Sequence, residues 1–303
     1  MPRDTALDGI HFMLPTPFTA DGAVDPGPFQ RLVDCAVASG CTGVVTLGVM
    51  GESHRLSDAE RSLAMNTVLQ AADGRLKVVV GISSQSGWDV AERAREASAA
   101  GASAVMASPP RMAKPNDSAV KAYYSAIQDA VETPIVVQDL PEQTGVHMSP
   151  EFIASLNRDL PSARYLKLED PPTPQKVTRV VAATGGNMSV FGGLGGAFLF
   201  EELRRGGAGT MTGFAYPEVL VAIYRKMQAG DKEGAREVFY RWLPLIRYEN
   251  SAGISLSIRK HLMTRRGLLD APHVRPPTPA VGADTVEELD DLLGSMNLDV
   301  SNL

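Results

Sequence analysis

The chain has 303 residues, of which 44% are hydrophobic and 21% are charged, and its formal net charge is −6. This composition is typical of a soluble globular protein, and the length suits a single α/β barrel with an appendage. The negative charge and the lack of a Lys/Arg cluster argue against a nucleic-acid partner. No apolar run approaches the roughly 20 residues that cross a membrane. Met1 to Asp8 contain no apolar signal-peptide stretch, so we expect a cytoplasmic protein.

Short apolar runs rich in β-branched residues alternate with helical stretches along the first two thirds of the chain. Such runs, separated by helices, indicate parallel strands that are buried on both faces. Eight strand–helix units of this kind close into a (β/α)8 barrel, the TIM barrel. The expected strands are residues 10–14, 44–47, 78–82, 104–106, 135–137, 165–168, 189–191 and 210–212.

The chain continues well beyond the eighth strand. We expect residues 1–214 to form the barrel, and residues 215–303 to supply its last helix and a C-terminal helical extension. The pattern from about residue 215 to residue 266 is helical, with its clearest break at Gly230-Asp231. A proline-rich loop over 270–284 and a last helix over 286–296 follow. No linker divides the chain into independent domains.

Lys167 lies near the C-terminal end of the expected sixth strand, before an Asp-Pro-Pro loop. Alternate side chains of a barrel strand point inward, and barrel enzymes keep their catalytic residues at this end. Desolvation disfavours the ammonium form of a buried lysine, and a free amine can attack a ketone to form a Schiff base. The alternative is a surface lysine on an edge strand.

Motifs at the ends of several strands carry a family resemblance. Together they resemble the dihydrodipicolinate synthase and N-acetylneuraminate lyase superfamily over essentially the whole chain. The resemblance implies Schiff-base chemistry at Lys167 on pyruvate or another 2-keto acid, and a homo-oligomer, either a tetramer or a dimer. The motifs are Pro15-Thr16-Pro17-Phe18, Gly48-Val49-Met50-Gly51-Glu52-Ser53, Ser108-Pro109-Pro110, Leu140-Pro141-Glu142-Gln143-Thr144-Gly145 and Lys167.

Within the superfamily, four segments look most like those of 2-keto-3-deoxy-L-arabonate dehydratases. They are residues 134–139, 167–169, 211–213, and 242–246 together with 249–250. The resemblance therefore favours a dehydratase.

The loop after the second strand departs from the family pattern. Where relatives carry two hydroxyl residues that help to hold the keto acid's carboxylate and relay a proton, this chain has Val49 and Met50. Consecutive backbone N–H groups of Met50 and Gly51 remain candidate donors to a carboxylate. The alternative is that Val49 and Met50 only plug the mouth of the barrel, although an apolar wall is also the normal lining of a ligand pocket.

Two tyrosine positions of the family are also changed, to Arg111 and Gln138. Arg111 stays charged and cannot act as a general acid, but it can bind a carboxylate or hydroxyls through its fork of donors. A surface salt bridge is the alternative. Gln138 can orient a hydroxyl or carbonyl but cannot donate a proton, and it favours a dehydratase over a synthase. Acid–base work then falls to a water molecule, Glu169 or another group.

Glycine clusters occur at residues 192–196 and 206–209, and neither has the context of a Rossmann or P-loop motif. A phosphate site and close backbone approach to the substrate or to neighbouring elements remain the alternatives. Gly192 and Met211 complete the candidate substrate-binding residues.

Other chemistries find little support in the sequence. Five scattered histidines lack carboxylates at metal-site spacing, so we expect neither a metal nor a cofactor. Cys35 and Cys41 have no ligand partner and read as inert thiols.

The sequence therefore predicts a metal-independent, Schiff-base lyase that dehydrates a 2-keto-3-deoxy sugar acid. Two alternatives remain within enzymes: a pyruvate-dependent aldolase, and a condensation like that of dihydrodipicolinate synthase. A third is a catalytically idle relative that only binds a keto acid, because hydroxyl and tyrosine groups of the family are missing.

Overall fold

The structure, a computed structural model, describes residues 3–296 and 300. Eight parallel strands close into a barrel in sequence order, because each strand pairs with the next and β8 pairs with β1. The predicted TIM barrel is confirmed, and the predicted strand ends differ from the observed ones by at most two residues. The strands are β1 (Gly9–Met13), β2 (Gly43–Thr46), β3 (Lys77–Gly81), β4 (Ala104–Ala107), β5 (Ile135–Asp139), β6 (Tyr165–Leu168), β7 (Ser189–Gly192) and β8 (Gly209–Thr212).

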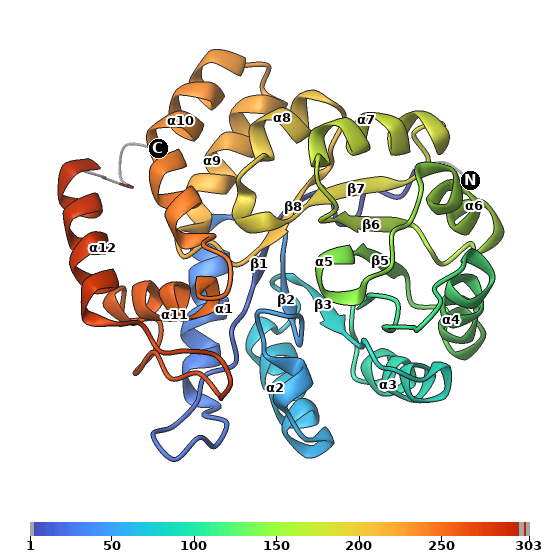
Figure 1. The fold of residues 1–303 in the computed structure, drawn as a ribbon, viewed down its shortest axis with the longest axis horizontal. Helices are drawn as coiled ribbons and strands as arrows, with labels where there is room; N and C mark the ends of the chain where they lie inside the picture. Colours follow the sequence, from blue (N-terminus) through green and yellow to red (C-terminus); the bar gives the residue numbers. More distant parts are fainter. Residues whose placement is uncertain (1–2, 297–299, 301–303) are drawn as a thin grey trace.

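Helices surround the strands, as Figure 1 shows. Those that precede the extension are α1 (Gly27–Ser39), α2 (Asp58–Ala72), α3 (Gly87–Ala99), α4 (Asp117–Ala130), α5 (Pro141–Thr144), α6 (Pro150–Asp159), α7 (Thr173–Ala183), α8 (Leu199–Arg204) and α9 (Pro217–Gln228). Two 3-10 turns, η1 (Ser53–Arg55) and η2 (Leu194–Gly196), lie in the loops after β2 and β7.

Local sequence explains several of these boundaries. Ser57 and Glu60 form a capping box at the start of α2, which satisfies backbone N–H groups that have no partner within the helix. Ser149 caps α6 by accepting a hydrogen bond from the Phe152 N–H, with Pro150 at the first helical position. The strands are buried almost throughout, as expected of parallel strands with helices on the outside and side chains filling the inside.

The C-terminal extension consists of α10 (Lys232–Glu249), α11 (Ser255–Arg265) and α12 (Ala283–Met296). The break at Gly230-Asp231 is confirmed, but a second interruption over residues 250–254 separates α10 from α11. The prediction of continuous helix up to residue 266 was therefore wrong at this point. A loop without helix or strand then leads to α12, which begins three residues earlier than predicted. Helices α11 and α12 lie along one side of the barrel (Figure 1).

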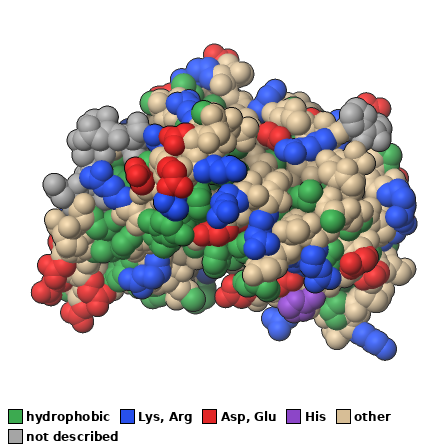
Figure 2. Space-filling model, turned by 90° about the horizontal axis from the view of Figure 1, so that it is seen from above, with side chains coloured by type: hydrophobic (Ala, Val, Ile, Leu, Met, Phe, Trp, Pro, Cys, Tyr) green, Lys and Arg blue, Asp and Glu red, His purple; other side chains and the backbone are tan. Residues whose placement is uncertain are grey.

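The surface is mixed in charge. On the face that carries α7, α8 and α10, apolar side chains gather in a patch among Lys, Arg, Asp and Glu side chains (Figure 2). Phe198 and Tyr240, which belong to this part of the chain, are two of the exposed large apolar residues. Within the described residues, no helix has the length and apolar character needed to cross a membrane.

Candidate active site

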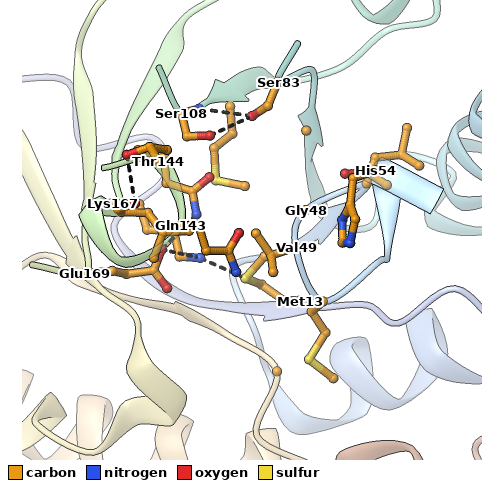
Figure 3. Close-up of a pocket in the computed structure, with 18 of the residues that line it drawn as sticks. Met13, Gly48, Val49, His54, Ser83, Ser108, Gln143, Thr144, Lys167 and Glu169 are labelled. Atoms are coloured by element: carbon orange, nitrogen blue, oxygen red, sulfur yellow. Dashed lines mark hydrogen bonds and ion pairs between the residues drawn. The ribbon is translucent and has the colours of Figure 1, made fainter. Parts of the chain in front are cut away.

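A cavity of about 740 Å³ opens at the C-terminal ends of the barrel strands, the end where barrel enzymes place their catalytic residues. Its volume lies in the usual range for small-molecule sites, roughly 300–1,000 Å³. Figure 3 shows Lys167 and Glu169 on one side of the cavity and His54 on the other. The residues predicted from the sequence that line it are Val49, Met50, Arg111, Gln138, Lys167, Glu169 and Met211.

Lys167 projects from β6 into this cavity, and only 2% of its surface is exposed. Its strand pairs with β5 on one side and β7 on the other, so the alternative of a surface lysine on an edge strand is wrong. The Nζ atom lies 3.1 Å from Oε2 of Glu169 and 3.2 Å from Sδ of Met13. A carboxylate and a thioether are thus the groups in reach of the amine.

Glu169 follows β6 directly, with Gln138 on one side of its carboxylate and Gly193 on the other. Nε2 of Gln138 donates to its Oε2 at 2.8 Å, and Gln138 lies opposite Lys167 in the register of β5 and β6. On the far side, a Cβ on Gly193 would come within 2.5 Å of Oε1 of Glu169. The missing side chain at Gly193 therefore makes room for a carboxylate that contacts Lys167 and is 9% exposed.

The loop after β2 is a tight turn. The Gly51 N–H donates to the Gly48 carbonyl at 3.0 Å, and Thr16 Oγ1 donates to the Gly51 carbonyl at 2.6 Å. Gly51 is not among the cavity-lining residues. The expectation that its N–H would be free for a carboxylate was therefore wrong, because the turn itself uses that donor. Val49 and Met50 do line the cavity.

Behind this loop lies a second buried lysine, Lys260 of α11. Its Nζ donates to Oε1 of Glu52 at 2.7 Å, to the Thr16 carbonyl at 2.8 Å and to the His273 carbonyl at 2.7 Å. It also sits 4.4 Å from the centre of the Phe18 ring. Lys260 does not line the cavity, so α11 uses it to anchor the loop that carries Val49 and Met50.

Arg111 lies on the loop after β4, is exposed, and lines the cavity. Among the residues that the structure describes it has no ion pair, so the alternative of a surface salt bridge is not observed. Its guanidinium remains available to a ligand at the outer part of the cavity.

Gly192 takes no part in the cavity lining. A Cβ at this position would meet the Glu202 carboxylate at 1.8 Å. Burial raises the pKa of Glu202 to about 7, and Thr173 Oγ1 donates to it. Gly192 thus permits close packing of α8 against β7. This is one of the two alternatives for the glycine cluster, the close approach of backbone to a neighbouring element.

Sequence reasoning missed several polar groups in the cavity. Ser83 and Ser108 lie with their hydroxyl oxygens 3.2 Å apart on one wall (Figure 3). Arg259 reaches the cavity from α11 and is 8% exposed. The sequence did contain a signal for Arg259. It lies among the apolar residues Ile258, Leu262 and Met263, and a charged side chain in such a segment indicates a buried polar role.

A metal centre and a reactive thiol each have requirements that can be compared with the described part of the chain. Among residues 3–296 and 300, no group of three or more His, Cys, Asp or Glu side chains is arranged to hold a metal ion. Burial raises the pKa of Cys41 to about 12 and also raises that of Cys35. Both cysteines are therefore thiols at neutral pH, as the sequence indicated.

Comparison with known proteins places this barrel and cavity in a family. Residues 6–296 match the dihydrodipicolinate synthetase family. The chain is 30% identical over 285 residues to the L-2-keto-3-deoxyarabonate dehydratase of Azospirillum brasilense, covering 93% of this chain and 92% of that protein. It is 32% identical to the 4-hydroxy-tetrahydrodipicolinate synthase of Hyphomonas neptunium, over 89% of this chain and 92% of the other.

Comparison with solved structures gives the same family. The crystal structure of dihydrodipicolinate synthase from Rhodopseudomonas palustris superposes with a TM-score of 0.91 at 34% identity, covering 97% of this chain and 99% of that one. The match in sequence spans the barrel, the cavity and α11 together. The chain therefore belongs to the dihydrodipicolinate synthetase family of lyases.

Proposed function

We propose that this protein is a Schiff-base lyase that dehydrates a 2-keto-3-deoxy sugar acid. The observation that carries the proposal is the position of Lys167: a buried amine at the C-terminal end of a barrel strand, 3.1 Å from a carboxylate and open to a cavity large enough for a five- or six-carbon acid. A desolvated amine of this kind is the usual nucleophile toward a ketone.

The chemistry follows from these groups. The Lys167 amine, once it has given a proton to Glu169, attacks the C2 carbonyl, and loss of water gives a protonated imine. Removal of a C3 proton leaves an enamine, because the iminium accepts the electron pair. That pair then expels the C4 hydroxyl, which takes up a proton and leaves as water. Hydrolysis of the unsaturated imine frees Lys167.

Glu169 is our candidate for the acid–base steps. Its carboxylate contacts Nζ of Lys167 and is held by the Gln138 amide, so it faces the carbon atoms next to the imine. The cavity lining within the described residues contains no tyrosine, which supports the choice of a carboxylate over a phenol. Ser83, Ser108 and Arg111 offer hydrogen bonds to the sugar-acid hydroxyls farther out.

Dehydration is preferred over carbon–carbon bond formation for two reasons. The similarity to a protein named L-2-keto-3-deoxyarabonate dehydratase covers nearly the whole chain, and Gln138 occupies a position where a proton-donating tyrosine suits synthases and aldolases. The alternative is a pyruvate-dependent aldolase or a condensation, which the similarity to 4-hydroxy-tetrahydrodipicolinate synthases favours. A protein that only binds keto acids is the non-enzymatic alternative.

Turnover screening decides among these. The protein is incubated with a panel of 2-keto-3-deoxy aldonates, and separately with pyruvate and aldehydes, in the presence of a chelator. Consumption of one aldonate with loss of water supports the proposal. Cleavage to pyruvate, or consumption of pyruvate and aldehyde, identifies an aldolase or synthase. Saturable binding without turnover identifies a binding protein.

Borohydride trapping tests the nucleophile. We expect reduction in the presence of pyruvate to add a stable adduct to Lys167, located by peptide mapping. Lys167→Ala should lose the adduct and at least about a thousandfold in turnover, as expected on removal of a nucleophile. Lys260→Met is the matched control, since it removes another buried lysine, one that does not line the cavity. An adduct on Lys260, or equal labelling of Lys167→Ala, would refute the mechanism.

Assembly and location stay predictions. Family resemblance leads us to propose a homo-oligomer, a tetramer or a dimer, acting in the cytoplasm on a small 2-keto acid.

A further inference from the structure

Two consecutive cationic residues of helix α11, Arg259 and Lys260, have different surroundings. Lys260 anchors the loop after β2, whereas Arg259 lines the cavity and is buried. The loop after β7 is shaped around Arg259, because a Cβ on Gly195 would come within 2.9 Å of its Nη2 and of Oδ1 of Asn250. Gly195 and Gly193 thus leave space for a guanidinium and a carboxylate, respectively.

The charge of Arg259 is only partly balanced by the protein. Its Nη2 donates to Oδ1 of Asn250 at 3.0 Å, and its Nη1 lies 3.7 Å from Sδ of Met50. The ion pair between its Nε and Oε1 of Glu249 is long, at 3.9 Å, and Nε makes no hydrogen bond. A buried guanidinium with these partners carries a desolvation cost that an anion would offset.

Glu249 does not fully balance this charge. Burial raises the pKa of Glu249 to about 7, and its Oε1 already accepts from the Ala215 N–H at 2.9 Å. The carboxyl is therefore partly protonated near neutral pH, and the positive charge of Arg259 remains available inside the cavity.

The substrate brings a negative charge to the same place. Every 2-keto acid that forms an imine at Lys167 carries a carboxylate bonded directly to the imine carbon. Glu169 stands beside Lys167 and would repel that carboxylate. Burial lowers the pKa of the Arg259 guanidinium, but Arg259 is close enough to Glu169 that the negative charge of Glu169 acts to raise that pKa. The three groups therefore lie in one electrostatic neighbourhood, with Arg259 as the cation not used in bond formation.

The other arginines of the cavity suit this task less well. Arg55 pairs with Glu52 at 3.0 Å, and Arg93 pairs with Asp89 at 3.1 Å. Arg111 is exposed on its loop, where solvent screens its charge.

We propose that Arg259 binds the carboxylate of the 2-keto acid itself, next to the imine carbon, and so fixes the keto acid for attack by Lys167. The inference rests on the proposed function, because it presumes an imine at Lys167. It makes the C-terminal extension part of the substrate site, and it gives this chain a cationic carboxylate anchor beside a loop whose Val49 and Met50 offer no side-chain donor.

Borohydride trapping with two probes tests this. Pyruvate carries the carboxylate, and pyruvamide has the same shape without the charge. The concentration that gives half-maximal adduct is measured for each probe on the wild type, Arg259→Gln and Arg259→Lys, and the melting temperature of each protein serves as the folding control. Arg93→Gln is the matched control, because Arg93 lines the cavity but pairs with Asp89.

We expect the wild type to prefer pyruvate strongly. Arg259→Gln should weaken pyruvate trapping by about ten- to a hundredfold, the range for a lost hydrogen bond to a charged group, and leave pyruvamide within about twofold, so that the preference collapses. Arg259→Lys should recover part of it, and Arg93→Gln should retain it.

Three outcomes would overturn the inference. Equal loss with both probes means that Arg259 only supports the structure of the site. An unchanged preference in Arg259→Gln means that the carboxylate is held elsewhere. If the wild type forms no adduct with any 2-keto acid, the proposed function fails and the inference fails with it, a result distinct from adduct formation with unchanged preference.

Discussion

Lys167 and Lys260 are both buried amines, one at the end of a barrel strand and the other in the extension helix α11, but their partners differ. Nζ of Lys260 donates to three oxygens at 2.7–2.8 Å. Nζ of Lys167 has one carboxylate oxygen at 3.1 Å and one thioether sulfur at 3.2 Å, and it faces a cavity. A lysine whose three donors are all used is a structural residue, whereas one with an unused donor beside open space can react.

The pKa alone would select Lys260 over Lys167, the nucleophile that we propose. Burial lowers the pKa of Lys260 to about 8, which by itself suggests an amine ready for nucleophilic attack. Deprotonation there would weaken the bonds to Glu52 and to two carbonyls, and no substrate can reach the amine from the cavity. Perturbed pKa values mark structural ion pairs as well as active sites, and hydrogen-bond partners distinguish the two.

After loss of Lys167 itself, the largest expected effect comes from changing the carboxylate beside it. Glu169→Gln preserves the shape of the side chain but removes the acid–base group, so kcat should fall by about 10²- to 10⁴-fold. The keto acid should still form an imine, so borohydride trapping of pyruvate should persist at a slower rate. Single-turnover kinetics with the best aldonate measure the loss. If kcat changes less than about tenfold, a water molecule or another group performs proton transfer.

Removing the charge of Lys260 should affect stability before chemistry. Lys260→Met leaves the buried Glu52 without this partner, and breaking a buried pair from one side costs about 3–5 kcal/mol. Urea unfolding measures the loss, and the folded fraction should still carry its adduct on Lys167. Adding Glu52→Gln should recover part of the stability, because it removes a buried carboxylate that has lost one of its two cationic partners and keeps only Arg55. A variant with full stability but no adduct would assign a chemical role to Lys260 and reverse the comparison.

The two lysines also show what the sequence could predict. The position of Lys167 in the barrel was predictable. Its strand is one of eight short, continuous apolar runs, so the local pattern is enough to place it. For Lys260 and Arg259 the apolar neighbours indicate burial, but the direction of each side chain was not predictable. Helix α11 is buried on several sides and has no polar face from which its orientation could be predicted.

Other details depended on tertiary packing. A glycine cluster predicts close approach but not the neighbour, and only the folded chain shows Gly192 facing Glu202 and Gly193 facing Glu169. The break between α10 and α11 had a local signal that was missed, since residues 250–253 read Asn-Ser-Ala-Gly, a cluster of turn-forming residues.

The smallest expected effect belongs to an exposed cation of the same cavity, Arg111. A hydrogen bond from a buried arginine to a charged substrate group is worth about 1.5–3 kcal/mol, but exposed charges are screened and their pairs contribute about 0.2–1 kcal/mol. Because Arg111 is exposed, Arg111→Ala should lower kcat/KM for the best aldonate by no more than about fivefold. Trapping of pyruvate should be unchanged, since pyruvate has no distal end for Arg111 to hold. A hundredfold loss for the aldonate alone would mean that the loop after β4 closes over the bound substrate and buries Arg111 with it. Parallel loss of trapping and turnover would instead mean that Arg111, like Lys260, supports the structure around the reactive lysine.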